Sequence, residues 1–219
     1  VKGKRAVAWR LVDEGFPNSS FDEKVAERAH DLARSSGKAD VMQGITLTPI
    51  ARAFAEDGVS YSTVEVALDR ADGTARVTVK APADEAPADM DAFTALGADA
   101  WMLRAARELD AAILHLRNNE KELGLIEFQT QGDPVNVVAH EALLLDHRAH
   151  WLANEVLQYW KRVLKRIDVT SRSLVAIVEH GSCFAGPLAE LLWAVDRSYM
   201  MLEEFDGDNR ALATVTLTE

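Results

Sequence analysis

The sequence predicts an α/β fold in which at least some strands run parallel. Two alternating apolar runs flank Asp72-Gly73 and indicate a β-hairpin, because Asp-Gly is a strong signal for a tight turn. A continuous apolar run at 173–181 (SLVAIVEHG) is typical of a strand covered on both faces. Helix-length segments separate the strands, and this alternation favours parallel pairing.

The first 60 residues show a weaker pattern than the rest. Residues 6–15 fit a short strand or a helix end, and residues 21–36 predict an amphipathic helix with apolar positions at helical spacing. Residues 37–60 keep no sustained period, which predicts a linker that crosses a surface. We therefore expect three parts, namely 1–36, the linker and 61–219.

The larger part alternates strands and helices in a regular order. After the hairpin, the predicted elements are a Pro/Ala/Asp loop at 81–89, a helix at 98–119, a strand running into a polar turn at 123–134, one or two helices at 137–167, the apolar strand at 173–181, a helix within 184–196, a DGDN turn at 206–209 and a last strand at 211–219.

Composition and charge narrow the classes of partner. The chain has 219 residues and a formal net charge of −11, which argues against nucleic acid and against an anionic membrane. No apolar run reaches the roughly 18 residues that span a bilayer. A single cysteine excludes an internal disulfide and fits a reducing cytoplasm. The chain opens on VKGKRAVAW and closes on ATVTLTE, so we expect a fold that is incomplete at both ends.

The stretch 181–190 carries the chemistry. Its turn GSCFAG has glycine at both ends, so backbone can approach a ligand closely, and Pro187 suits a first helical position. A helix start offers free N–H donors, each worth ~3 kcal/mol to a developing oxyanion. Glu190 lies opposite the apolar face, and a carboxylate in a dry site can move protons. The alternative is structural, because acidic residues are common in first turns.

Other residues of this stretch and of neighbouring segments have structural alternatives. Cys183 fits a nucleophile at a strand-to-helix turn, but no base is evident beside it, which favours a small buried residue. Several histidines and acids lie near one helical face, and we favour a polar face over a metal site: His140, Glu141, Asp146, His147 and His150. Four tryptophans at helical positions fit a core better than a ligand cage: Trp101, Trp151, Trp160 and Trp193.

The segment 175–200 (VAIVEHGSCFAGPLAELLWAVDRSYM) resembles the signature of the crotonase, or enoyl-CoA hydratase/isomerase, family, with a glycine turn one residue longer. Further segments resemble a divergent branch of that family in the same order: WRLVDEG, ALDRADGTARVTVKAP, ARELDAAILHLRNNEKELG and FQTQGDP. This resemblance implies a crotonase-like ββα spiral. It makes 1–36 the C-terminal tail of one crotonase-like part and 61–219 the front of a second.

The resemblance also implies an oxyanion hole for a thioester carbonyl. One backbone donor falls on Thr130, where the strand within 123–134 runs into its polar turn. The other belongs to the helix start, where the matching residue, Pro187, has no N–H. Gly186 or Leu188 is then expected to donate instead, and we assign Gly186.

Two glutamates handle water in hydratases of this family, and the resemblance places them at Glu190 and Glu219. Glu219 also continues an alternating apolar row of the last strand, although a terminal residue can simply be frayed. The neighbouring turns supply the expected substrate-binding residues, which are Gln131, Gly132, Asp133 and Phe184.

The implied activity is a lyase that opens an oxidised, dearomatised benzoyl-CoA ring with water, in aerobic benzoate degradation. Formate and a semialdehyde-CoA would be released. Coenzyme A is then part of the substrate, no metal or other cofactor is needed, and a cytoplasmic homo-oligomer is expected. Lys80, Arg104 and Arg107 are candidates for the coenzyme A phosphates. Two alternatives stay open, another enoyl-CoA hydratase or isomerase and a catalytically inert fragment.

Overall fold

The computed structural model describes residues 1–37, 44–202 and 212–218. The chain divides into two compact units, Val1–Gly44 and Ile45–Glu219. The division falls inside the segment 37–60, where the sequence predicts a linker. Each unit is described by itself.

The first unit is helical. It contains α1 (Gly3–Ala8), a short 3-10 turn η1 (Asn18–Ser20) and α2 (Phe21–Ser35). The helix predicted at 21–36 is confirmed, and the ambiguous segment 6–15 contributes to a helix rather than to a strand. The apolar side chains of α2 are exposed, with Phe21 at 49% and Leu32 at 56%.

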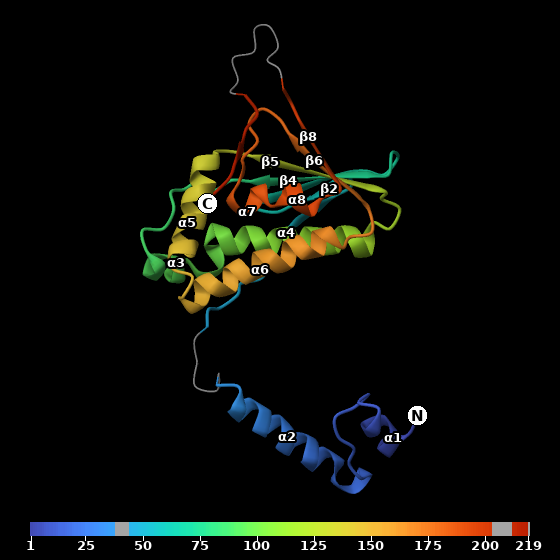
Figure 1. Cartoon of the computed structure of the whole chain (residues 1–219). Coiled ribbons are helices and arrows are strands. Elements are labelled where there is room, and N and C mark those ends of the chain that lie inside the picture. Colours follow the sequence, from blue (N-terminus) through green and yellow to red (C-terminus); the bar gives the residue numbers. More distant parts are fainter. Residues whose placement is uncertain (38–43, 203–211, 219) are drawn as a thin grey trace. The chain divides into compact units, whose positions relative to one another are not determined.

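The second unit is built on a seven-stranded mixed sheet (Figure 1). Neighbouring strands follow the order β1 (Ala53–Ala55), β2 (Gly58–Ser60), β3 (Val64–Asp69), β4 (Thr74–Lys80), β5 (Leu125–Gln131), β6 (Ser173–Val178) and β8 (Arg197–Met200). The first four strands pair antiparallel, and the pairs from β4 to β8 are parallel. The predicted α/β class with parallel strands is confirmed.

The segment predicted as a linker departs from that prediction over 53–60. Strands β1 and β2 form there and extend the sheet, with Gly58 opposite Ala67. A Cβ at Gly58 would lie 2.1 Å from the carbonyl oxygen of Val66, so only glycine allows this approach. Both strands have three residues, which is too short for an alternating pattern to stand out in the sequence.

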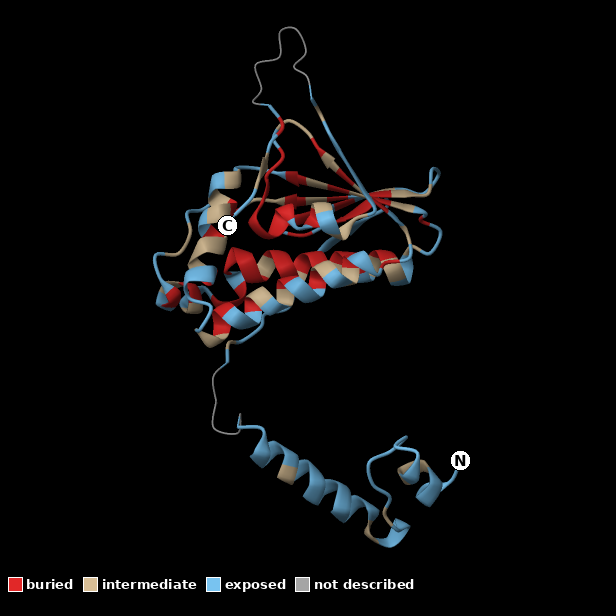
Figure 2. Cartoon of the chain, in the orientation of Figure 1, coloured by how far each residue is buried: buried red, intermediate tan, exposed pale blue. Residues whose placement is uncertain are grey.

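Helices cover one face of the sheet. They are α3 (Met90–Leu96), the 3-10 turn η2 (Gly97–Asp99), α4 (Trp101–Asn119), α5 (Pro134–Asp146), α6 (Trp151–Asp168), α7 (Gly186–Ala189) and α8 (Leu191–Ala194). Helices α4 and α6 lie side by side beneath the sheet, and their inward faces are buried (Figures 1 and 2). No helix in the described part of the chain is long and apolar enough to cross a bilayer.

The two faces of the sheet differ in polarity. Val64, Val77 and Phe128 point toward the helices and are fully buried. The opposite face carries ion pairs, including Arg76 with Glu127 at 2.8 Å and Lys80 with Glu65 at 2.9 Å. Strand β6 follows the same alternation, with Leu174, Ala176 and Val178 buried and the residues between them partly exposed. The expected coverage of that strand on both faces is therefore not seen within the described residues.

The predicted helix within 184–196 is divided. Residues Phe184–Ala185 form a short strand, β7, which pairs in parallel with β9 (Val215–Thr216). The helical part then consists of α7 and α8, two single turns joined at Glu190. Strand β9 is the described portion of the last strand predicted at 211–219, while the predicted DGDN turn lies outside the described residues.

Candidate active site

A crevice opens at the carboxyl ends of β5 and β6. The ladder between these strands runs to the pair Phe128–Ala176, whereas the ladder between β4 and β5 continues to Lys80–Gln131. A cavity of about 370 Å³ lies where the ladder with β6 stops, and Thr130, Gln131 and Gly181 are among its lining residues. Crevices at the carboxyl ends of parallel strands are the usual ligand sites of open α/β sheets.

The backbone of β5 directs the Thr130 amide toward this crevice. Gln131 accepts a hydrogen bond through its carbonyl from the Ala81 amide at 2.8 Å, on the β4 side. Gly132 donates from its amide to the Gly181 carbonyl at 3.0 Å, on the β6 side. Successive residues of a strand point their amides to opposite sides, so Thr130 faces the same side as Gly132. That is the orientation an oxyanion donor at Thr130 requires.

The turn 181–186 is fastened to the end of β5. The Cys183 amide donates to Thr130 Oγ1 at 2.8 Å, and both residues are buried. The two turns expected to carry the backbone donors are therefore neighbours in the fold. Burial also raises the pKa of the Cys183 thiol to about 11, so the thiol stays protonated at neutral pH. This favours the small buried cysteine over a nucleophile.

Gly186 begins α7 in a conformation that favours glycine. Its φ is +49°, and a Cβ there would lie 2.8 Å from Oε2 of Glu141. Pro187 follows within the first turn and offers no N–H, as expected from the sequence. The role of Gly186 as the second donor stays a prediction.

Glu190 differs from its expected environment. The apolar face opposite to it is buried as predicted, with Leu188 and Leu191 both at 0% exposure. The Glu190 side is exposed, however, and Trp193 beside it is 61% exposed. The expectation of a carboxylate in a dry site is therefore wrong for the described part of the chain, as is the core position expected for Trp193. The cause is local, because two single helical turns leave this side uncovered by the described residues.

Glu141 is the carboxylate that sequence reasoning missed at this site. It lies on α5, is half-buried and accepts a hydrogen bond from Thr218 Oγ1 at 3.0 Å. Burial raises the pKa of this carboxyl, the Thr218 hydrogen bond lowers it, and the negative charge of Glu190 raises it further. The sequence offered Glu141 only as a member of the histidine-rich face, since its partners are 45 and 77 residues away along the chain.

The remaining predicted site residues have structural contacts of their own. The Asp133 Oδ1 caps α5 by accepting a hydrogen bond from the Val135 amide at 2.8 Å. Gly132 has φ +131°, and a Cβ there would lie 2.6 Å from the Ala81 Cβ. Phe184 is fully buried in the core, and Glu219 lies outside the described residues. Their functional roles stay predictions.

The histidine-rich face does not form a metal site within the part of the chain that the structure describes. His140 is buried, with Nδ1 2.9 Å from the Asn136 carbonyl oxygen and its ring edge-on to Trp101. Helix α5 ends at Asp146, so His147 and His150 follow the helix rather than continue its face. The expected polar face is wrong for His140, which is buried against Trp101.

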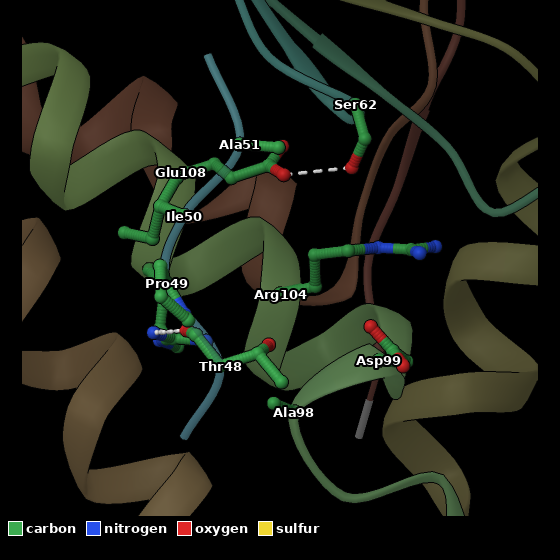
Figure 3. Close-up of a pocket in the computed structure, with 10 residues that line it drawn as sticks. Thr48, Pro49, Ile50, Ala51, Ser62, Ala98, Asp99, Arg104 and Glu108 are labelled. Carbon is green, nitrogen blue, oxygen red and sulfur yellow. Dashed lines mark hydrogen bonds between the residues drawn. The ribbon is translucent and has the colours of Figure 1, made fainter.

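Two further cavities gather basic side chains near α4. One of about 400 Å³ is lined by Lys80, Arg104 and His140 among others. A neighbouring one of about 180 Å³ is shown in Figure 3, where Arg104 extends between Ser62 and Asp99. Arg104 Nε is buried without a hydrogen-bond partner among the described residues, so Arg104 is the side chain available to an anionic ligand. Lys80 is paired with Glu65 at 2.9 Å, and Arg107 donates to the Thr48 carbonyl at 2.6 Å.

Proteins of the enoyl-CoA hydratase class have similar solved structures. One, assigned as an enoyl-CoA hydratase from Streptomyces avermitilis, matches with a TM-score of 0.37 and 14% sequence identity. The match covers 67% of this chain and 46% of that protein's chain. An enoyl-CoA hydratase from Geobacillus kaustophilus HTA426 matches with a TM-score of 0.37 and 13% sequence identity. That match covers 68% of this chain and 47% of the hydratase chain. No protein-family model matches the chain.

A particular relative is much more similar in sequence. Over 201 residues, 92% of this chain, the sequence is 41% identical to the benzoyl-CoA-dihydrodiol lyase of Aromatoleum evansii. The chain spans 36% of the length of that protein. The resemblance predicted from the sequence motifs is thereby confirmed.

Proposed function

We propose that this chain is part of an acyl-CoA lyase that opens an oxidised, dearomatised benzoyl-CoA ring with water. The products would be formate and an unsaturated semialdehyde-CoA. The observation that carries the proposal is the 41% identity, over 92% of the chain, to a benzoyl-CoA-dihydrodiol lyase. The activity of that relative is a proposal for this chain, because the chain spans only 36% of the relative's length.

The crevice beyond β5 supports an oxyanion hole. A thioester carbonyl placed there would accept a hydrogen bond from the Thr130 amide, which faces the gap left by β6. The start of α7 would supply the second donor, and we retain Gly186 for that role. Each backbone donor would stabilise the enolate of the transition state by ~3 kcal/mol.

Proton handling falls to carboxylates in this proposal. Glu190 lies four residues beyond Gly186 and is accessible, so it can hold a water against the substrate. Glu219 is proposed as its partner because it follows Thr218, whose hydroxyl reaches Glu141 beside Gly186. Gln131, Gly132, Asp133 and Phe184 remain the proposed substrate-binding residues.

Coenzyme A enters as part of the substrate, and we propose no separate cofactor. Lys80 and Arg104 line the same cavity, where they can meet phosphate groups. We place the protein in the cytoplasm because one cysteine in 219 residues fits a reducing compartment. We also propose a homo-oligomer, in keeping with the exposure of Trp193, Tyr199 and Leu202, and light scattering of the purified protein checks its mass.

Two assays on the full-length protein test the proposed activity. Calorimetry with benzoyl-CoA should show micromolar binding, and an absence of binding would identify an inert fragment. Incubation with 2,3-epoxybenzoyl-CoA should release formate stoichiometrically with ring opening. If crotonyl-CoA is hydrated and no formate appears, the protein is an enoyl-CoA hydratase and the lyase assignment is wrong.

A further inference from the structure

Glu141 occupies the place where the segments of the proposed site meet. Its side chain packs over Gly186, with Oε2 2.8 Å and Cδ 3.0 Å from the position of a Cβ at that glycine. The same Oε2 accepts the hydrogen bond from Thr218, on the segment that leads to Glu219. The side chain therefore contacts both the helix start that is to hold the oxyanion and the strand that is to bring the second glutamate.

The surroundings of Glu141 are unusual for a structural carboxylate. Carboxylates removed from water are normally neutralised by a cation or bound by several donors, and Glu141 is partly removed from water. Among the described residues, Glu141 has no ion pair, and the charged group that acts on it is Glu190, another carboxylate. Two neighbouring carboxylates of different exposure are a recurring arrangement of acid and base.

We propose that Glu141 is a further catalytic residue, the general acid that works opposite Glu190 as the general base. This inference rests on the proposed function and gives the general-acid role in its hydration step to Glu141 instead of Glu219. The exposed carboxylate, Glu190, is accessible to the water whose proton it would take. The half-buried one, Glu141, accepts the Thr218 hydrogen bond on Oε2, and Oε1, which has no hydrogen-bond donor among the described residues, would carry the proton.

The step balances between these two groups. Glu190 takes a proton from water while the water oxygen forms a bond to the carbon β to the thioester. The π electrons of the conjugated double bond move onto the thioester oxygen. As this enolate collapses, the α carbon forms a C–H bond with the proton of Glu141. One proton is taken from water and one is returned, so the pair keeps its total charge.

The first test compares Glu141→Gln with the wild type in the full-length protein, using 2,3-epoxybenzoyl-CoA. We expect kcat to fall about 100-fold, the usual worth of a general acid, with KM within about 3-fold. The alkaline limb of the kcat/KM profile should disappear, which a merely structural role would not cause. Asp146→Asn, on the same helix and exposed, is the matched control and should leave both quantities unchanged.

A second variant keeps the test decisive if Glu141→Gln fails to fold. Thr218 is exposed, and its hydrogen bond lowers the pKa of Glu141. Thr218→Val should therefore move the alkaline limb to higher pH while kcat stays within several-fold. A full kcat in Glu141→Gln, or an unmoved limb in Thr218→Val, overturns the role of Glu141. If the wild-type protein releases no formate, the proposed function is overturned instead. The same variants are then compared by their rates of crotonyl-CoA hydration. A wild type inactive in both assays overturns both.

Discussion

Two carboxylates of the second unit, Glu108 on α4 and Glu141 on α5, meet very different surroundings. Glu108 is 4% exposed and accepts a hydrogen bond from the Ser62 hydroxyl at 2.7 Å (Figure 3). It also accepts hydrogen bonds from the Thr63 amide and hydroxyl at 2.6 Å each. Glu141 is less buried and, within the described residues, accepts one hydroxyl donor and faces a like charge. Glu108 fixes a loop to a helix, whereas Glu141 has capacity left for a reaction. The number and sign of a carboxylate's partners thus say more about its role than its burial does.

The largest effect on stability is expected at Glu108. In Glu108→Ala the Thr63 amide, the Thr63 hydroxyl and the Ser62 hydroxyl lose their acceptor in a buried setting. We expect a loss of about 3 kcal/mol in the free energy of unfolding, measured by urea denaturation of the full-length protein. A change below about 1 kcal/mol would mean that Glu108 and Glu141 are equivalent as structural residues.

Gly186→Ala tests the packing of Glu141 over the start of α7. The new Cβ would meet Glu141 Oε2 at 2.8 Å and would sit on a residue with φ +49°. We expect about 2 kcal/mol of destabilisation together with a clear loss of kcat. Combining this change with Glu141→Ala should recover part of the stability, because the obstructing side chain is gone. No recovery in the double variant would contradict the packing argument.

Asp133→Ala separates a capping role from a substrate-binding role. The side chain accepts the Val135 amide at the start of α5, so its loss should cost about 1 kcal/mol of stability. If capping is its whole role, the calorimetric affinity for benzoyl-CoA stays within about 2-fold of the wild type. A large loss of affinity would instead support the substrate contact expected from the sequence.

The smallest effect, and the one of opposite sign, is expected for the stability of Glu141→Gln. The folded state raises the pKa of Glu141, so its contribution to stability falls as pH rises from the unfolded pKa through the folded one. Above that pH window the negative charge of Glu141 is half-buried and repelled by Glu190, which destabilises the folded wild type, whereas a glutamine carries no charge. We expect Glu141→Gln to be more stable by less than about 1 kcal/mol at pH 8, with the difference vanishing below pH 4. Thermal unfolding at the two pH values measures this difference.

Local signals predicted much of the second unit. Asp72-Gly73 marked the hairpin of β3 and β4, and periodic apolar residues marked α4, α5 and α6. The segment 137–167 proved to be two helices, separated between Asp146 and Trp151. Strand β8 was missed because its four residues are all exposed and show no alternation. Short edge strands gain their order from a partner strand, which a single segment does not display.

The candidate site was predicted less evenly. The backbone donors at Thr130 and Gly186 follow from the family resemblance and stay predictions, although the bond between Cys183 and Thr130 brings the two turns together. The exposure of Glu190 could not be predicted from the sequence, because it depends on which segments cover α7 and α8. Glu141 was missed as a site residue because Gly186 and Thr218 lie far from it in the sequence. Contacts of this length leave no local pattern.

The ladder between β5 and β6 stops at Phe128 while the ladder with β4 continues to Gln131, and this has a consequence for how the site can vary. The proposed donor at position 130 belongs to the main chain, so replacing the threonine with any residue other than proline leaves the N–H in place. Side-chain mutagenesis will therefore register only the bond to Cys183 and will underrate the position. An amide-to-ester exchange at residue 130 would remove the donor itself. Side chains around this position can change, and substrate preference with them, while the backbone N–H is kept.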